Sequence, residues 1–331
     1  MKRWLLYFLL IVVGLGIVYE AGPRFPEPQL GKELPVIPVG VDSIVQYVRQ
    51  QESRFPVKPD NESLILWGDS VGKKTEYVLL YLHGFSASRF EAYPVTHDFV
   101  REFKVNAYLA RLAEHGLEDE EPLLHMTPER LYASAREALA IARKLGNKVI
   151  IMSTSTGGTL SLMLAADFPR LVDGLILYSP NIAIKNAAAP LLSGPWGLEI
   201  ARMVYGGKYR FSGDAPDSKT CRYWNCKYRL EATVYLQQLL DVRMTAAEFR
   251  KVQVPVFLGY YYKDKQHQDE TVDVKAALRM FDELGTPDEM KVKVAFPGAG
   301  AHVIACELTS GSVKEVEEQT FLFVREAFGL K

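Results

Sequence analysis

Short apolar runs alternate with longer amphipathic segments along most of the chain, from about Leu64 to the C-terminus. The short runs predict strands at Leu64–Trp67, Tyr77–Leu82, Asn106–Ala110, Lys148–Met152, Gly174–Tyr178, Val254–Tyr261 and Lys291–Phe296. The longer segments predict helices at Ala92–Lys104, Pro128–Leu145, Gly158–Asp167, Val272–Leu284 and Val313–Phe328. Strands that alternate with helices of this length favour an α/β fold with a mostly parallel sheet and helices on both of its faces.

The alternation fails between about Pro180 and Lys251, where helical and irregular patches occur without a strand pattern. An insertion of this size after a central strand predicts a cap over a site. We therefore expect residues 61–331 to form one domain that carries a cap at 181–251. Residues 23–60 are rich in proline and contain one short helical stretch at 41–51, so we interpret them as an extended linker with a short helix.

The first 22 residues differ from the rest of the chain. Sixteen uncharged residues, Trp4 to Tyr19, follow Lys2 and Arg3, a pattern typical of a signal anchor or a signal peptide. Tyr19 and Glu20 do not suit a signal-peptidase site, which favours an uncleaved membrane anchor. The two basic residues would keep the N-terminus in the cytoplasm and place the body outside it; cleavage would instead give a secreted protein.

Composition narrows the choice of partners and of compartment. The 331 residues are 48% hydrophobic, and 39 basic residues face 40 acidic ones, so no basic excess is available to bind nucleic acid. Cys221 and Cys226 are close enough for a local disulfide in an oxidising compartment, although two reduced thiols fit the sequence as well. Cys306 is expected to be a buried thiol. No His/Cys spacing resembles that of a metal site.

The turn after the strand at 148–152 is the first candidate for chemistry. A nucleophilic serine between a strand and a tightly packed helix needs small residues two positions before and after it. Ser155 has Ser153 and Gly157 at those positions, which makes a relaxed form of G-x-S-x-G. Serine and threonine also favour helix starts as caps, so the motif alone is weak.

Two further loops follow predicted strands. His83 and Gly84 open a loop of small residues whose Phe85 N–H, with the N–H of Thr156, is suited to binding an oxyanion. We expect the side chain of His83 to brace this loop. His302 lies in a glycine-rich loop after the last strand, a setting that fits a catalytic base.

A carboxylate that orients the imidazole should follow the strand at 254–261. Asp264 and Asp269 are both available, and we favour Asp269 because it leads into a helix. The order Ser155, Asp269, His302 is the chain order of the α/β-hydrolases.

These features resemble the α/β-hydrolase superfamily, over about three quarters of the chain. Within it, the stretches "LHGFSAS", "NAYLARLAEHGL", "HMTPERLYASAREALAIARKLGNKVIIMSTSTGGTLSLMLA" and "GAHV" are similar to the monoacylglycerol lipase, carboxylesterase and serine aminopeptidase-like group. The chain has Glu114 and Ser153 where the group usually has glycine, which leaves subfamily and substrate open. The resemblance implies a serine hydrolase on an eight-stranded type of sheet, with neither a metal nor an organic cofactor.

The expected activity is hydrolysis of a small-molecule ester, monoacylglycerol or lysophospholipid-like esters included, through an acyl-enzyme on Ser155. Cap residues could line an acyl-chain space or form only the cap's own core; they are Leu191, Leu192, Trp196 and Met203. Two alternatives remain. One is a small aminopeptidase-like enzyme that catches the substrate amine with a cap carboxylate, for which the candidates are Glu199, Asp214 and Asp217. The other is an inactive hydrolase fold used for binding.

Overall fold

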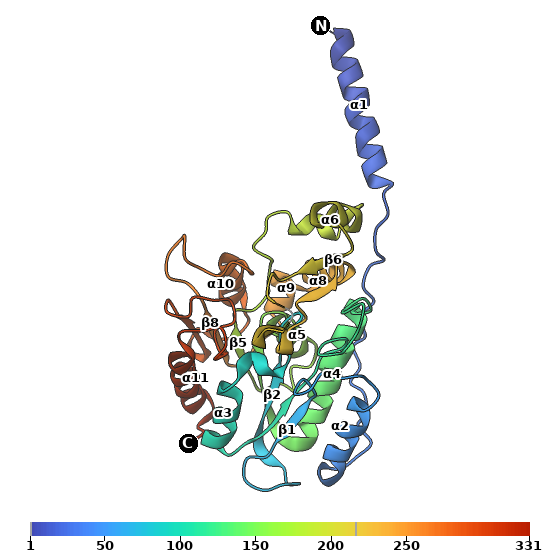
Figure 1. Ribbon diagram of the computed structural model, residues 1–331. Helices are drawn as coiled ribbons and strands as arrows, with labels where there is room; N and C mark the ends of the chain where they lie inside the picture. Colours follow the sequence, from blue (N-terminus) through green and yellow to red (C-terminus); the bar gives the residue numbers. More distant parts are fainter. Residues whose placement is uncertain (1, 216) are drawn as a thin grey trace.

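A seven-stranded sheet runs through the computed structural model, which describes residues 2–215 and 217–331 (Figure 1). Its strands are β1 (Leu64–Leu66), β2 (Thr75–Leu82), β3 (Asn106–Leu109), β4 (Gly146–Thr154), β5 (Gly174–Tyr178), β8 (Val256–Tyr260) and β9 (Lys291–Ala295). Their order across the sheet is β1-β3-β2-β4-β5-β8-β9, and only β1 runs antiparallel to its neighbour within the described residues. The mostly parallel sheet is thus confirmed, with seven strands in place of the eight that the resemblance implied.

The central strands are apolar on both faces because helices cover both sides of the sheet. In β2, Val78, Leu80 and Leu82 pack into one hydrophobic cluster, whereas Leu79 and Tyr81 pack into the other, and all five are fully buried. Successive side chains of a strand point to opposite faces. A continuous apolar run is therefore what a doubly covered strand requires.

One face of the sheet packs against α2, α4, α5 and α10, and the other against α3 and α11. The helices outside the cap are α1 (Lys2–Glu20), η1 (Val41–Ser43), α2 (Ile44–Glu52), η2 (Arg89–Ala92), α3 (Val95–Phe103), α4 (Pro128–Leu145), α5 (Thr156–Asp167), α10 (Val274–Glu283), η4 (Asp288–Met290) and α11 (Val313–Phe328). Every helix and strand expected from the alternation is present, with ends that differ by at most three residues.

The segment between β5 and β8 lies over one end of the sheet (Figure 1). It contains η3 (Ala189–Leu192), α6 (Gly197–Tyr205), β6 (Tyr209–Phe211), α7 (Lys219–Tyr223), β7 (Lys227–Arg229), α8 (Glu231–Arg243) and α9 (Ala246–Phe249). The expectation of no strand here is wrong, because β6 and β7 form a small antiparallel sheet. Both are three residues long and contain charged side chains in place of an apolar run, and their pairing depends on the chain returning on itself.

Helix α1 projects from the end of the molecule that carries α6 (Figure 1). In the described residues it is the one helix that is long and apolar enough to cross a membrane: Arg3–Glu20 has a mean hydropathy of 1.7. The indole of Trp196 donates to the carbonyl of Val18 at 3.3 Å, so the insertion contacts the last turn of this helix. The proline-rich segment runs along the body, where Ile37 is buried.

Candidate active site

The carboxyl ends of the parallel strands meet at the edge of the sheet beneath the insertion. Four of these strands, β2, β4, β8 and β9, are followed by the loops that carry Phe85, Ser155, Asp269 and His302 respectively. Ligands of open α/β sheets bind at this edge. The topology therefore gathers all the sequence-predicted site residues at one end of the molecule.

Ser155 stands alone between β4 and α5 in a strained backbone conformation, with φ 53° and ψ −117°. Its N–H donates to the carbonyl of Tyr178 at 3.0 Å, and its own carbonyl accepts from Asn181 at 2.9 Å. The helix start is so close to β2 that a Cβ on Gly157 would lie 2.0 Å from the carbonyl oxygen of Leu82. Non-glycine residues hold such a φ only where the surroundings impose it. Here the packing of α5 against β2 imposes it.

Asp269 and His302 lie in direct contact. The carboxylate oxygen Oδ2 of Asp269 is 2.6 Å from Nδ1 of the His302 ring. The other oxygen, Oδ1, accepts the backbone N–H groups of Thr271 at 2.8 Å and Val272 at 3.0 Å. Asp269 is 1% exposed. Its carboxylate is therefore satisfied on both oxygens and holds the ring in one orientation.

The charges of this pair alter each other's titration. Burial lowers the pKa of His302, but the charge and hydrogen bond of Asp269, with the charge of Glu91, raise it above its ordinary value. Burial raises the pKa of Asp269, but His302 and the two backbone N–H groups hold it below its ordinary value. The pair is therefore built to keep Asp269 ionised and to stabilise a proton on His302.

Ser155 and His302 both line a cavity of about 530 Å³ beneath the insertion. Nε2 of His302 is buried and has no hydrogen-bond partner among residues 2–215 and 217–331. Catalytic hydrogen bonds are often long before substrate binds. A larger cavity, of about 670 Å³, lies between α2 and α4 and is lined by other residues, such as Glu52 and Arg111.

The loop after β2 lies directly against Ser155, since a Cβ on Gly84 would be 3.0 Å from the Cβ of Ser155. Nδ1 of His83 bonds to the carbonyl of Gly84 at 2.9 Å, and its Nε2 accepts the N–H of Leu112 at 3.0 Å. His83 thus braces the loop, as predicted. The N–H of Phe85 meets no acceptor in the described part of the chain. Thr156, as the first residue of α5, has no helical acceptor for its N–H.

The cavity is walled by apolar side chains of the insertion. Leu191 and Leu192 line it, which is one of the two roles that the sequence left open for them. Met203 and Trp196 do not fit the same expectation: Met203 is 76% exposed, and Trp196 contacts α1. The other lining residues from η3 and α6 include Ala189, Ile200, Ala201, Val204 and Tyr205.

Glu91 is the site residue that the sequence did not predict. It is 2% exposed, lines the cavity with Ser155 and His302, and accepts the N–H of Gly84. Burial raises the pKa of this carboxyl to about 7, against the opposing effects of the Gly84 N–H and His302. Only its place seven residues after Gly84, close to the proposed oxyanion donor Phe85, could have drawn attention to it.

The remaining carboxylates considered from the sequence lie elsewhere. Asp264 is partly exposed and pairs with His267, its carboxylate oxygens 2.9 Å from the ring Nδ1. Glu199, Asp214 and Asp217 are exposed on the insertion.

Comparisons with known proteins agree with this architecture. A model of the alpha/beta hydrolase family matches residues 79–306, more than half of the chain. A structure from work on the metagenome-derived lipolytic enzymes LipS and LipT has a TM-score of 0.65 at 16% identity, covering 82% of this chain and 99% of that one. Est1E from Butyrivibrio proteoclasticus with ferulic acid bound has a TM-score of 0.55 at 18% identity, covering 81% and 95%.

The monoacylglycerol lipase of Paleococcus ferrophilus has a TM-score of 0.55 at 15% identity, covering 80% of this chain and 98% of its own. Identities this low show a shared fold. No curated protein sequence matches the chain. The family match and the arrangement of the sheet agree: this chain belongs to the alpha/beta hydrolase family.

Proposed function

We propose that the chain is a serine ester hydrolase in which Ser155 is the nucleophile, His302 the general base and Asp269 the residue that orients the base. One observation carries the proposal. His302 is held at Nδ1 by a buried carboxylate at 2.6 Å, while its Nε2 is unpaired in the described structure and shares a cavity with Ser155. An imidazole with one nitrogen fixed and the other free has the geometry of a general base.

The reaction follows from these positions. His302 Nε2 takes the hydroxyl proton as Ser155 Oγ attacks the acyl carbonyl. The N–H groups of Phe85 and Thr156 stabilise the oxyanion that forms. The ring then returns the proton to the alcohol oxygen as the ester bond breaks. A water molecule, deprotonated by the same ring, attacks the acyl-enzyme and releases the acid and Ser155.

The N-terminal helix supports a membrane location for this enzyme. The 18 residues Arg3–Glu20 would extend about 27 Å as a helix, close to the thickness of a bilayer core. The disulfide between Cys221 and Cys226 fits an oxidising compartment. We therefore propose an anchored enzyme with its catalytic domain outside the cytoplasm.

The substrates proposed are esters with an apolar acyl chain, lipid-like esters included. The cavity above Ser155 has apolar walls from Leu191, Leu192 and Ile200. A series of p-nitrophenyl esters of increasing chain length tests this proposal. We expect kcat/KM to rise from the acetate to a medium-chain ester, and an unchanged or falling value would exclude a lipid-like substrate.

The central experiment compares Ser155→Ala with Ser153→Ala on p-nitrophenyl butyrate. Ser153 supplies a matched hydroxyl, because it is buried two residues earlier in β4, the strand that leads to Ser155. We expect S155A to lose hydrolysis and labelling by a fluorophosphonate probe, and S153A to retain both. Undiminished turnover by S155A would remove Ser155 from the mechanism.

The two alternatives give different results in the same assays. An aminopeptidase would cleave aminoacyl-naphthylamides in preference to esters. Its substrate amine would need a carboxylate in the cavity, and buried Glu91 meets that need better than exposed Glu199, Asp214 or Asp217. An inactive binding protein would fail to react with the fluorophosphonate probe.

A further inference from the structure

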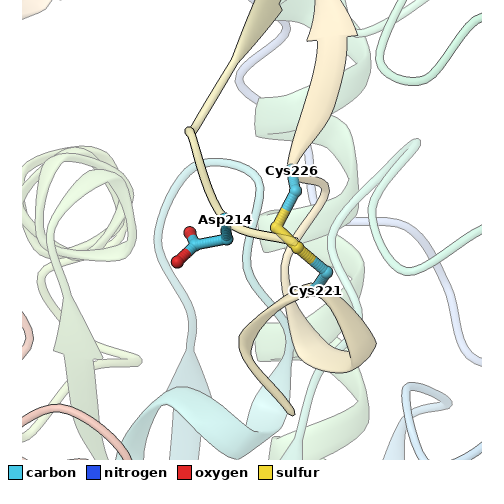
Figure 2. Close-up of side chains that lie close together, drawn as sticks. All are labelled: Asp214, Cys221 and Cys226. Carbon is cyan, nitrogen blue, oxygen red and sulfur yellow. A yellow bond between two sulfur atoms is a disulfide. The ribbon is translucent and has the colours of Figure 1, made fainter. Parts of the chain in front are cut away.

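The loop closed by Cys221 and Cys226, here called the disulfide loop (residues 221–226), lies against the active site rather than at the rim of the insertion. Figure 2 shows the disulfide between α7 and the start of β7, with the Asp214 carboxylate beside it. The two sulfur atoms are bonded to each other and so present no thiolate to a metal ion. The residues between the two cysteines contact parts of the protein outside the insertion.

Two residues of the disulfide loop contact the segment that follows β2, here called the oxyanion segment (residues 84–91). The N–H of Asn225 donates to the carbonyl of Ser86 at 2.7 Å. The ring of Tyr223 stacks on Phe90, with centroids 3.9 Å apart and planes 6° from parallel. Trp224 lies between them in sequence and lines the cavity.

The oxyanion segment needs such support. Ser86 has a φ of 62°, a left-handed conformation that residues other than glycine seldom adopt. It persists where neighbouring groups impose it. Asn225 supplies one such group by binding the carbonyl of Ser86, and Glu91 supplies another by accepting the N–H of Gly84. Phe85, the proposed oxyanion donor, stands between these two held residues.

Trp224 brings the disulfide loop to the cavity itself. Its side chain and that of Glu91 both line the cavity that contains Ser155. The disulfide loop thus contacts the oxyanion segment at Ser86 and at Phe90 and shares the cavity wall with Glu91.

The disulfide loop is itself tied to the body of the protein. Lys58 Nζ donates to Oδ1 of Asn225 at 2.8 Å, and Asn61 Nδ2 donates to the carbonyl of Arg222 at 3.0 Å. The disulfide joins the two ends of the loop, where α7 and β7 are each too short to be stable alone. Opening it would therefore release the residues that hold the oxyanion segment.

We propose that the disulfide loop is a positioning element for the Phe85 N–H, so that full activity requires the Cys221–Cys226 bond. This inference rests on the proposed function, because it assumes that Phe85 stabilises an oxyanion. Displacing this N–H group by part of an ångström weakens the stabilisation of the transition state and leaves ground-state binding of the substrate largely unchanged. We expect a loss in kcat of about 10- to 100-fold with little change in KM.

The test compares the oxidised wild type with the double variant Cys221→Ser/Cys226→Ser. All buffers contain EDTA, so that no metal ion can bind between Asp214 and the free thiols of the reduced wild type. Thiol titration in denaturant should give one free thiol in the oxidised wild type, Cys306, and three after reduction. Three free thiols in the oxidised sample overturn the inference. Reduction should lower kcat of the wild type and leave the double variant unchanged.

A second pair of variants keeps the disulfide and probes the stack alone. Tyr223→Leu removes the aromatic face that packs on Phe90, and Tyr223→Phe retains it. We expect Y223L to lower kcat per folded enzyme at constant KM and Y223F to match the wild type. Expressing kcat per folded enzyme removes the loss that general destabilisation would cause. Wild-type kcat in the double variant and in Y223L overturns the inference. An oxidised wild type that neither hydrolyses esters nor reacts with the probe overturns the proposed function itself.

Discussion

Replacing Asp269 by asparagine would test the proposed role of this buried carboxylate, which is to orient the His302 ring toward Ser155. Asparagine has the same shape, so its carbonyl oxygen can keep the two backbone N–H groups of Thr271 and Val272. Its NH₂ group would then face Nδ1 of His302, where the carboxylate oxygen now lies at 2.6 Å. Two donors cannot face each other, so Nδ1 becomes the acceptor and the ring proton moves to Nε2. In that tautomer the ring cannot accept the proton of Ser155.

The size of the effect follows from the tautomer. A wrong tautomer in a triad of this kind lowers kcat by about 10⁴-fold, which is about 5 kcal/mol of transition-state stabilisation. The shape is conserved and the hydrogen bonds to Thr271 and Val272 remain. We therefore expect the loss in activity to be far larger than the loss in folding stability.

The pH profile gives an independent check. His302 must be neutral to accept a proton, so activity falls as the pH drops through its pKa. Although burial lowers that pKa, Asp269 and Glu91 hold it above the ordinary value for histidine. Removing the charge of Asp269 lowers it, so the acidic limb of kcat/KM in the variant should lie at lower pH than in the wild type.

The assay measures kcat/KM for p-nitrophenyl butyrate between about pH 5 and pH 9, below the pH where base hydrolysis dominates. Asp264→Asn is the matched control, because Asp264 also pairs with a histidine but is partly exposed outside the cavity. We expect D264N to behave as the wild type. A large loss in D264N together with full activity in D269N would refute the assignment of Asp269.

Three further predictions concern stability and location. Gly157→Ala should lower the free energy of unfolding, measured in urea, by about 1–3 kcal/mol, because its Cβ would lie 2.0 Å from the backbone oxygen of Leu82. Gly207→Ala is the control, because a Cβ at Gly207 would have no atom within 4 Å. Equal losses in the two variants would contradict the packing argument. Despite its burial, Asp269 has a folded-state pKa below its unfolded value, so its stabilisation is present above the unfolded pKa and lost as the pH falls through the folded one. Below the range in which His302 titrates, the gap in unfolding free energy between wild type and D269N should therefore narrow from about pH 5 to about pH 3, and a constant gap there would refute this. Removing residues 1–22 should abolish flotation with lipid vesicles and preserve hydrolysis of the butyrate ester, whereas retained flotation would show that another surface binds the membrane.

Much of the fold could be predicted because its signals are local. β5 and α4 begin and end where the sequence pattern placed them, since each is a single apolar or amphipathic run bounded by turn residues. The bend at Ser155 was also visible, because a strand and a helix can meet that closely only through small residues such as Gly157. The chain order of Ser155, Asp269 and His302 could be written down before any coordinates.

Other features depend on contacts between segments that are distant in the sequence. The strands β6 and β7 exist only because they pair, and their residues, Tyr-Arg-Phe and Lys-Tyr-Arg, carry no apolar run of the kind that marks β1. In the sequence Glu91 looks like an ordinary surface carboxylate; only the fold buries it, and burial raises its pKa to about 7 against the opposing effects of Gly84 and His302. The sequence favoured Asp269 over Asp264, but only the fold shows that Asp269 contacts the His302 ring whereas Asp264 pairs with His267. Local periodicity determines which segments are helix or strand, but burial, hydrogen-bond pairing and electrostatic field arise only when the folded chain brings those segments together.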